Sequence, residues 1–300
     1  MPKTRADSAM TEARAHLSTA ALQQAAEAFR RARLYYHEAD DHDGEAQALT
    51  ELGDMELRAG RRWAAQEAYL EARGMLAQGG SHHRQGELLI RLGDMAQHDG
   101  RLTESRELLL TAREQFGISG DSAGEAQALR HLGHLEAEEG REDKALDCYQ
   151  RAYALAREVG DTRGEASSLK ALADLHIRVG HADKAHDAFE SVLELFRTHG
   201  DMLGQARAHH GLGHVLLTLG NKGGARENFS AATTLFARTG DLRGEALALQ
   251  SLARMEETAN PSQARRHFQH AGELFSRIGA GEEAGACRAS ATALAPRGTQ

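Results

Sequence analysis

The sequence repeats itself every 40 residues, and this period constrains the fold more than any other feature. A leucine followed by a small residue recurs six times at that interval. The six pairs are Leu52-Gly53, Leu92-Gly93, Leu132-Gly133, Leu172-Ala173, Leu212-Gly213 and Leu252-Ala253. A fixed period of roughly 20–50 residues is typical of proteins that stack copies of one small unit, because each copy must bury its apolar face against its neighbours. We therefore expect a repeat array rather than two globular domains.

Each unit contains two helical patterns. In the unit at 121–160, apolar residues recur three and four positions apart, at Leu129 and Leu132 and again at Tyr149 and Ala152. This spacing is typical of helices that bury one stripe. We expect Gly133 to let the neighbouring helix approach closely, because it has no side chain.

Glycines separate the helical patterns, since a glycine can take the left-handed conformation that ends a helix. They stand in the middle of the units (Gly60, Gly100, Gly140, Gly180 and Gly220, with Asn260-Pro261 in the sixth) and at their ends (Gly80, Gly120, Gly160, Gly200, Gly240 and Gly279). An aspartate follows four of the closing glycines, and aspartate is a good N-cap for the next helix. These aspartates are Asp121, Asp161, Asp201 and Asp241.

The repeats divide the chain into four parts. Residues 41–279 hold the six units, and residues 1–40 are expected to be an N-terminal helical segment that ends in half a repeat. Within that segment residues 1–7 are polar and expected to be loose. Residues 280–294 predict a C-terminal capping helix, and residues 295–300 predict a tail.

The composition of the chain argues against some classes of function and location. The chain has 36 Lys and Arg against 44 Asp and Glu, a balance that argues against nucleic-acid binding. Only two cysteines occur, Cys148 and Cys287, which fits a reducing compartment. No signal peptide and no apolar run of membrane-spanning length is present, so we expect a cytoplasmic protein without membrane insertion. The excess of Arg over Lys suggests a bacterial source.

These residues resemble the tetratricopeptide repeat (TPR). The family pattern L-x-x-L-G, followed by A-x-x-x-[FY]-x-x-A, is present as Leu129, Leu132, Gly133, Ala145, Tyr149 and Ala152. The 40-residue unit with GDxxGEA between units is similar to the repeats of spindle-orientation adaptors, kinesin light chains and several bacterial regulators. The resemblance implies an all-α, right-handed superhelical solenoid of antiparallel helix pairs. It also implies that the first helices line a concave groove for a peptide, a helix or a protein surface.

The resemblance places the groove on each first helix, one, four and eight residues after the alanine of GEA. The early units present carboxylates there, among them Asp54 and Asp94. The later units present mainly bases, which are Arg130, His134, Lys170, Arg207, His210, His214 and Arg254, beside one acid, Asp174. Because complementary charge selects partners, this contrast predicts a partner segment with acidic residues. The alternative is that these long polar side chains only solvate a helical face.

Histidines in the groove suggest a second chemistry. His210 and His214 stand four residues apart on one helix face, a spacing that suits Zn²⁺ or Ni²⁺ when a third ligand lies nearby. Asp174 and His134 are the candidate further ligands. The pair lacks the glutamate of HExxH, so we predict no metal and no other cofactor, and we keep these four residues as candidates. Titration near neutral pH is another possible role for the pair. His209 replaces a leucine and is expected to be a satisfied core histidine.

Motifs of catalysis are missing. The segment GNKGGA at 220–225 lacks the spacing of a phosphate-binding loop. Cys148 has no identifiable base and is expected to be a structural thiol. We therefore do not expect an enzyme.

Three functions remain open. The first is a protein-interaction scaffold or adaptor, anchored by Arg130, Lys170, Arg207, His210, His214 and Arg254. The second is a regulatory sensor whose groove takes a small ligand or a metal. The third is a self-assembling scaffold, favoured by groove residues that are apolar and expected to be exposed. These are Ile90, Ile177, Leu217 and Leu247.

Overall fold

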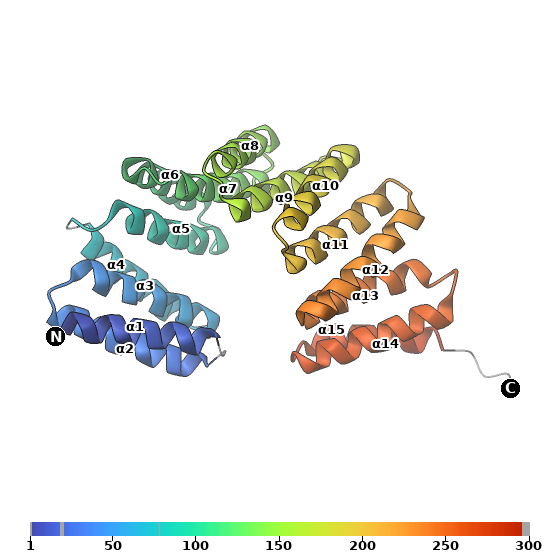
Figure 1. Cartoon of the computed structure of the whole chain (residues 1–300), viewed down its shortest axis with the longest axis horizontal. Coiled ribbons are helices and arrows are strands. Elements are labelled where there is room, and N and C mark those ends of the chain that lie inside the picture. The colour runs from blue at the N-terminus through green and yellow to red at the C-terminus, as the bar shows by residue number, and fades with distance from the viewer. Residues whose placement is uncertain (1, 19–20, 78, 296–300) are drawn as a thin grey trace. The chain divides into compact units, whose positions relative to one another are not determined.

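The computed structural model describes residues 2–18, 21–77 and 79–295, and this part of the chain is helical throughout, without a strand. Its fifteen helices follow one another through short turns (Figure 1). The chain divides into two compact units, unit 1 at Met1–Gly164 and unit 2 at Glu165–Gln300. The predicted all-α solenoid of helix pairs is confirmed. None of the described helices is long and apolar enough to cross a membrane.

Unit 1 consists of helix pairs in which consecutive helices pack side by side (Figure 1). They are α1 (Pro2–Ser18), α2 (Leu22–Glu38), α3 (His42–Arg58), α4 (Arg62–Leu76), α5 (His82–His98), α6 (Leu102–Ser119), α7 (Ser122–Glu138) and α8 (Glu142–Glu158). Helix α9 (Thr162–Arg178) begins at the end of unit 1 and continues into unit 2.

Unit 2 continues the same arrangement after α9. Its further helices are α10 (Ala182–Thr198), α11 (Met202–Thr218), α12 (Lys222–Thr239), α13 (Leu242–Glu256), α14 (Pro261–Arg277) and α15 (Gly281–Ala293). Helix α15 packs on α14 and buries Ala284, Cys287 and Ala291. Of the expected tail, residues 296–300 lie outside the described residues.

The N-terminal segment is more ordered than the sequence predicts. Residues 2–7 were expected to be loose, but they form the first turns of α1, where Ala6 is buried and the Tyr36 hydroxyl donates to Asp7 at 2.7 Å. The segment holds two helices, α1 and α2, that pack against each other. The prediction failed because one apolar residue, Ala6, and one buried hydroxyl order a stretch that is otherwise polar.

The predicted N-caps are confirmed. Asp121, Asp161, Asp201 and Asp241 each accept a hydrogen bond from the backbone N–H of the glycine three residues later, at 2.8–3.0 Å. Two helix ends differ from the prediction. Gly79 rather than Gly80 has a positive φ, and Asn260 is not left-handed but caps the start of α14 by accepting from the backbone of Gln263.

The close approach expected at the marker glycines is also present. A Cβ added to Gly133 would lie 2.4 Å from the ring of Tyr149, and one added to Gly213 would lie 2.5 Å from the ring of Phe229. A ring from the second helix thus rests directly on the first helix of its own pair. Interiors this dense lose stability when even one methyl group is added.

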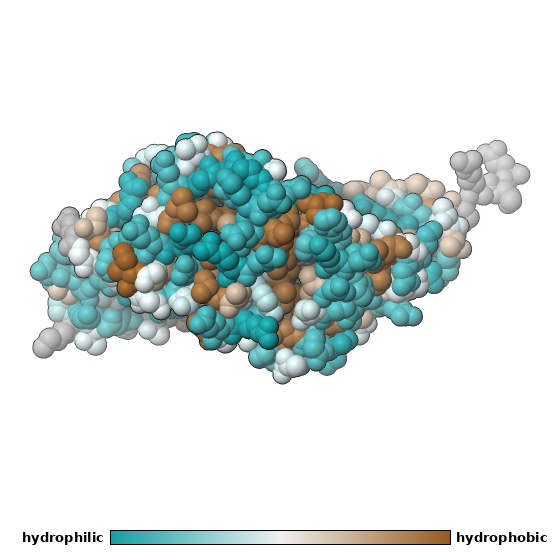
Figure 2. Space-filling model, turned by 90° about the horizontal axis from the view of Figure 1, so that it is seen from above, coloured by the Kyte–Doolittle hydropathy of each residue, from teal (hydrophilic) through white to brown (hydrophobic). Residues whose placement is uncertain are grey.

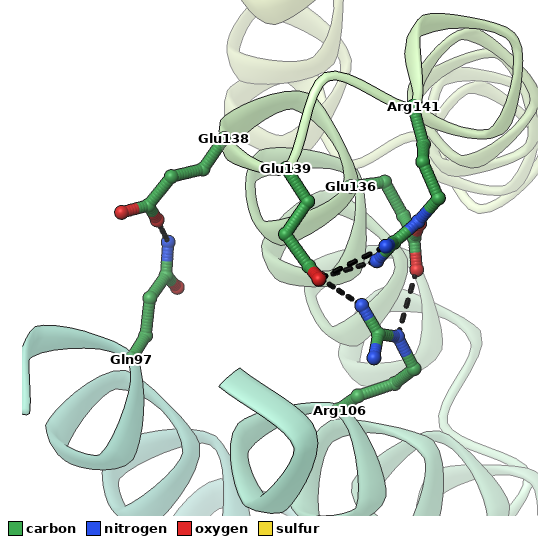
Figure 3. A network of polar contacts seen from close by, with 6 residues as sticks. All are labelled: Gln97, Arg106, Glu136, Glu138, Glu139 and Arg141. Carbon is green, nitrogen blue, oxygen red and sulfur yellow. Dashed lines mark hydrogen bonds and ion pairs between the residues drawn. The ribbon is translucent and has the colours of Figure 1, made fainter. Parts of the chain in front are cut away.

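Buried carboxylates tie successive pairs together. Glu136 at the end of α7 receives Arg106 of the preceding α6 at 3.0 Å and also pairs with Arg141 (Figure 3). Glu139 bonds the same two arginines, so each guanidinium is shared between two carboxylates. Because a buried carboxylate is costly without a partner, this network holds α6 against α7.

We predict that Asp40→Gly stabilises the protein. Asp40 is the one non-glycine residue with a positive φ (56°) in the described chain, and it occupies the closing position that glycine holds in later units. Relief of this conformation should raise the free energy of unfolding by about 0.5–1 kcal/mol, measured by urea denaturation. The reciprocal control is Gly120→Asp, at φ 69° with no atom near an added Cβ, which should lower it by a similar amount. Equal stability of Asp40→Gly and the parent chain would contradict the prediction.

Candidate functional site

In unit 1, ion pairs between successive 40-residue repeats close the face formed by the first helices. Asp54 of α3 accepts from Arg91 of α5 at 2.9 Å, and Asp94 of α5 contacts His131 of α7 at 2.7 Å. Asp54 also accepts from the hydroxyl of Tyr69. The two aspartates that were expected to form an acidic groove therefore already have partners. The sequence suggests an acidic groove in the early repeats and a basic groove in the later ones, but in the structure these pairs reduce the acidic character of the early repeats.

Arg130 and His134 lie on α7, in unit 1. Burial lowers the pKa of Arg130, and no hydrogen bond or ion pair of its guanidinium occurs among the described residues. His134 contacts the hydroxyl of Tyr149 at 2.8 Å through Nδ1. Arg130 is thus an available cation, whereas one nitrogen of His134 is already engaged.

Unit 2 contains a cavity of about 460 Å³ on its first-helix face. It is lined by Lys170, Asp174 and Ile177 of α9, Phe189 of α10, Arg207, His210, Gly211 and His214 of α11, Phe236 of α12, Asp241 at the N-cap of α13, and Arg243, Gly244 and Leu247 of α13. The structure therefore brings together five of the residues predicted from the sequence: Lys170, Asp174, Arg207, His210 and His214.

One position on the first helices differs in size between unit 1 and unit 2. The residue before the marker leucine is large in the first three 40-residue repeats, where it is Glu51, Arg91 and His131. It is small in the last three repeats, where it is Ala171, Gly211 and Ser251. In unit 1 the long side chains at this position fill the face and form the pairs described above. At Gly211 the ring of Phe189 comes so close that an added Cβ would lie 2.4 Å from it.

His210 and His214 form the inner wall of the cavity. Their rings lie 4.7 Å apart in an edge-to-face arrangement, and both pack on Phe229. Burial, helped by the neighbouring His214, lowers the pKa of His210 to about 4. Burial and the charge of Arg254 lower the pKa of His214. For His210 the expectation of titration near neutral pH is therefore wrong, because packing against the ring of Phe229 removes water that would stabilise an imidazolium.

Cations surround the cavity, each beside one carboxylate. Lys170 pairs with Asp174 at 2.6 Å, and Arg207 lies 3.8 Å from Asp241. Arg243 contacts Glu283 of α15 at 3.1 Å. All three cationic side chains are more than half exposed, so these pairs are weak and can exchange for a ligand. Arg254 does not line the cavity but acts on His214 through its charge.

The candidate metal ligands are not gathered into a site. Among the described residues, no group of three or more His, Cys, Asp or Glu side chains is placed to hold a metal ion. His209, expected to be a satisfied core residue, is half-buried and contacts Asn228 at 2.8 Å. Cys148 is half-buried, and burial raises the pKa of its thiol.

Apolar groove residues divide into two groups. Ile177 and Leu247 are exposed at 38% and 37% and line the cavity, as expected. Ile90 is only 3% exposed, so its assignment to the exposed surface was wrong; it packs in a core cluster with Leu109 and Phe116. Gly211, Asp241 and Arg243 line the cavity but were not predicted from the sequence as site residues. The loss of bulk before the marker leucine was the signal in the sequence that could have identified Gly211.

Comparisons with known proteins agree with this architecture. A family model for the tetratricopeptide repeat matches residues 84–158 and 124–198. The apo form of RapI is 12% identical over 83% of this chain and 97% of its own, with a TM-score of 0.63. A Rap protein complexed with competence and sporulation factor is 13% identical over 98% and 96%, with a TM-score of 0.59.

A third structure widens the range of similar proteins. The putative kinesin light chain repeats of Podosopora anserina are 16% identical over 67% of this chain and 98% of their own, with a TM-score of 0.55. At these identities the likeness concerns the fold. The comparison with curated proteins gave no match.

The depressed pKa of His210 predicts a loss of stability in acid. In the unfolded chain this imidazole binds a proton near pH 6.5, whereas in the folded chain it stays neutral down to about pH 4. Protonation therefore favours unfolding, and stability falls as the pH drops through this window, by on the order of 3 kcal/mol at about pH 4.

A substitution isolates this contribution. His210→Gln keeps a hydrogen-bonding side chain but cannot titrate, so urea denaturation from about pH 7.5 to about pH 4 should show a smaller loss than in the parent chain. His42→Gln, at a side chain 59% exposed, is the control and should leave the loss unchanged. The same acid loss in His210→Gln and the parent would refute the buried, neutral state of His210.

Proposed function

We propose that this chain, part of which matches the tetratricopeptide-repeat family model, is a protein-interaction scaffold whose unit 2 cavity holds an acidic segment of a partner protein. The observation that carries the proposal is the combination of one cavity of about 460 Å³ with exposed cations at its edge and apolar side chains within it. Carboxylates of a partner would contact Arg207 and Arg243, and an apolar side chain would pack on Leu247.

The chemistry of the cavity supports this choice of partner. Its two imidazoles are neutral at neutral pH, so they can donate and accept hydrogen bonds without adding charge. Ile177 and Leu247 expose apolar surface that a partner side chain would cover. The exposed arginines can form charge-assisted hydrogen bonds, which are the stronger kind.

We predict that charge reversal at the cavity edge abolishes partner capture. The double variant Arg207→Glu with Arg243→Glu should lose proteins that the parent chain retains in affinity capture, because each anchoring bond becomes a repulsion. Leu247→Asp should weaken the same capture by placing a charge on the apolar wall. Both changes fall on exposed side chains, so helicity measured by circular dichroism should stay the same.

The control variant makes the same arginine-to-glutamate change at a position that does not line the cavity. Arg238→Glu lies in the last turn of α12, and Arg238 is not one of the residues that line the cavity. A partner of the cavity is retained by Arg238→Glu and lost by both cavity variants. Retention of the same proteins by all variants would disprove the proposed site.

A regulatory sensor is the second candidate function, and the size of the cavity favours it. Small-molecule sites enclose about 300–1,000 Å³ and combine apolar walls with a few polar groups, as this cavity does. A metabolite that binds there should raise the thermal midpoint of the parent chain but not that of Leu247→Asp. Self-assembly stays a prediction that light scattering at several concentrations would test.

A further inference from the structure

A second groove lies in unit 1, between the second helices α6 and α8. It encloses about 440 Å³ and is lined by Arg106, Leu110 and Arg113 of α6, Leu129, Leu132 and Glu136 of α7, and Asp143, Lys144, Asp147, Cys148 and Arg151 of α8. Leu129 and Leu132 form its floor, and Leu110 is 42% exposed beside it. Figure 2 views the side of unit 1 that carries α6 and α8, where hydrophobic patches lie between hydrophilic side chains.

The corresponding groove two repeats earlier is closed by the chain itself. Between α2 and α4, Arg33 of α2 pairs with Glu71 of α4, across the position of the groove. Arg33 also reaches the buried Glu45 of α3 at 3.5 Å. The ion pair therefore bridges the two second helices and covers the first helix between them.

The same two positions carry like charges in the α6–α8 groove. Eighty residues after Arg33 and Glu71 stand Arg113 and Arg151. Both line the groove, and the positive charges of both act on the thiol of Cys148 between them. Two arginines cannot form the bridge, so the groove remains open.

The charges around this groove are incompletely matched. Arg113 and Lys144 have no hydrogen bond or ion pair among the described residues. Arg151 lies 3.3 Å from Asp147, but both side chains are about 60% exposed, so this pair is weak. Glu136 does not compensate for Arg113, because Arg106 and Arg141 already engage it (Figure 3).

We propose that the α6–α8 groove docks an acidic amphipathic segment of a partner protein, with a carboxylate between Arg113 and Arg151 and an apolar side chain against Leu110 and Cys148. The carboxylate would take the place that Glu71 holds between α2 and α4. Leucine-rich floors flanked by cations suit a helix with one apolar face and glutamates beside it. This surface is distinct from the cavity of unit 2 and would engage a separate segment.

Cys148 provides a local measure of occupancy. Cys287 is 0% exposed, so Cys148 is the thiol that maleimide should label in the folded chain. The probe is a synthetic amphipathic helical peptide with leucines on one face and glutamates beside them, and its control replaces those glutamates with lysines. The glutamate peptide should bind in fluorescence anisotropy and slow the labelling of Cys148 severalfold, followed by intact mass. Equal behaviour of the two peptides, or binding that leaves labelling unchanged, would overturn the proposal.

Two variants test the arginines. Arg113→Gln should weaken binding of the glutamate peptide about tenfold, because one attraction is lost and no ion pair with Arg151 can form. Arg151→Glu recreates the pairing of Arg33 with Glu71, so it should close the groove, slow Cys148 labelling without any peptide and abolish peptide binding. Arg157→Glu makes the same change in charge on α8 outside the groove and should alter neither measurement. Unchanged labelling and binding in Arg151→Glu would also overturn the proposal.

Discussion

The contact between a ring of the second helix and a side-chain-free position of the first helix governs both the fold and the site. At Gly133 the ring of Tyr149 occupies the space of a missing Cβ, and at Gly213 the ring of Phe229 does the same. Because the ring lies there, the residue after the glycine faces it. His134 meets a hydroxyl and contacts it, whereas His214 meets a bare phenyl edge and packs on it. The choice between Tyr and Phe in the scaffold thus decides how much hydrogen-bonding capacity the site residue retains.

A second choice, the size of the residue before the marker leucine, decides whether the first-helix face is closed or open. Arg91 and His131 each extend to an aspartate of the preceding 40-residue repeat and so close the first-helix face of unit 1. Gly211 has no side chain with which to do so, and it lines the cavity of unit 2. Neither change alters the stripes that fold the helices, so the repeat can vary its binding surface while its core packing stays constant.

The sequence predicted the parts of the structure that depend on local and periodic rules. Helix pairs, the caps at Asp121 and Asp241 and the close approach at Gly133 all follow from residue type and spacing. Contacts between units were beyond those rules. Asp54 counted as a free acid until Arg91, thirty-seven residues away, was found beside it. Likewise His210 counted as a base, because its burial against Phe229 depends on three-dimensional packing.

In a repeat protein, the surface of one repeat can be compared with the corresponding surface of another repeat in the same chain. Where Arg33 and Glu71 stand in register on two second helices, an ion pair bridges them, so the geometry of the scaffold permits that bond. Where Arg113 and Arg151 stand in the same register, the backbone offers the same geometry and the charges oppose it. At this pair of positions the two grooves therefore differ in charge. A groove kept open in this way selects its occupant by charge, and a carboxylate would complete the arrangement that Arg33 and Glu71 make two repeats earlier.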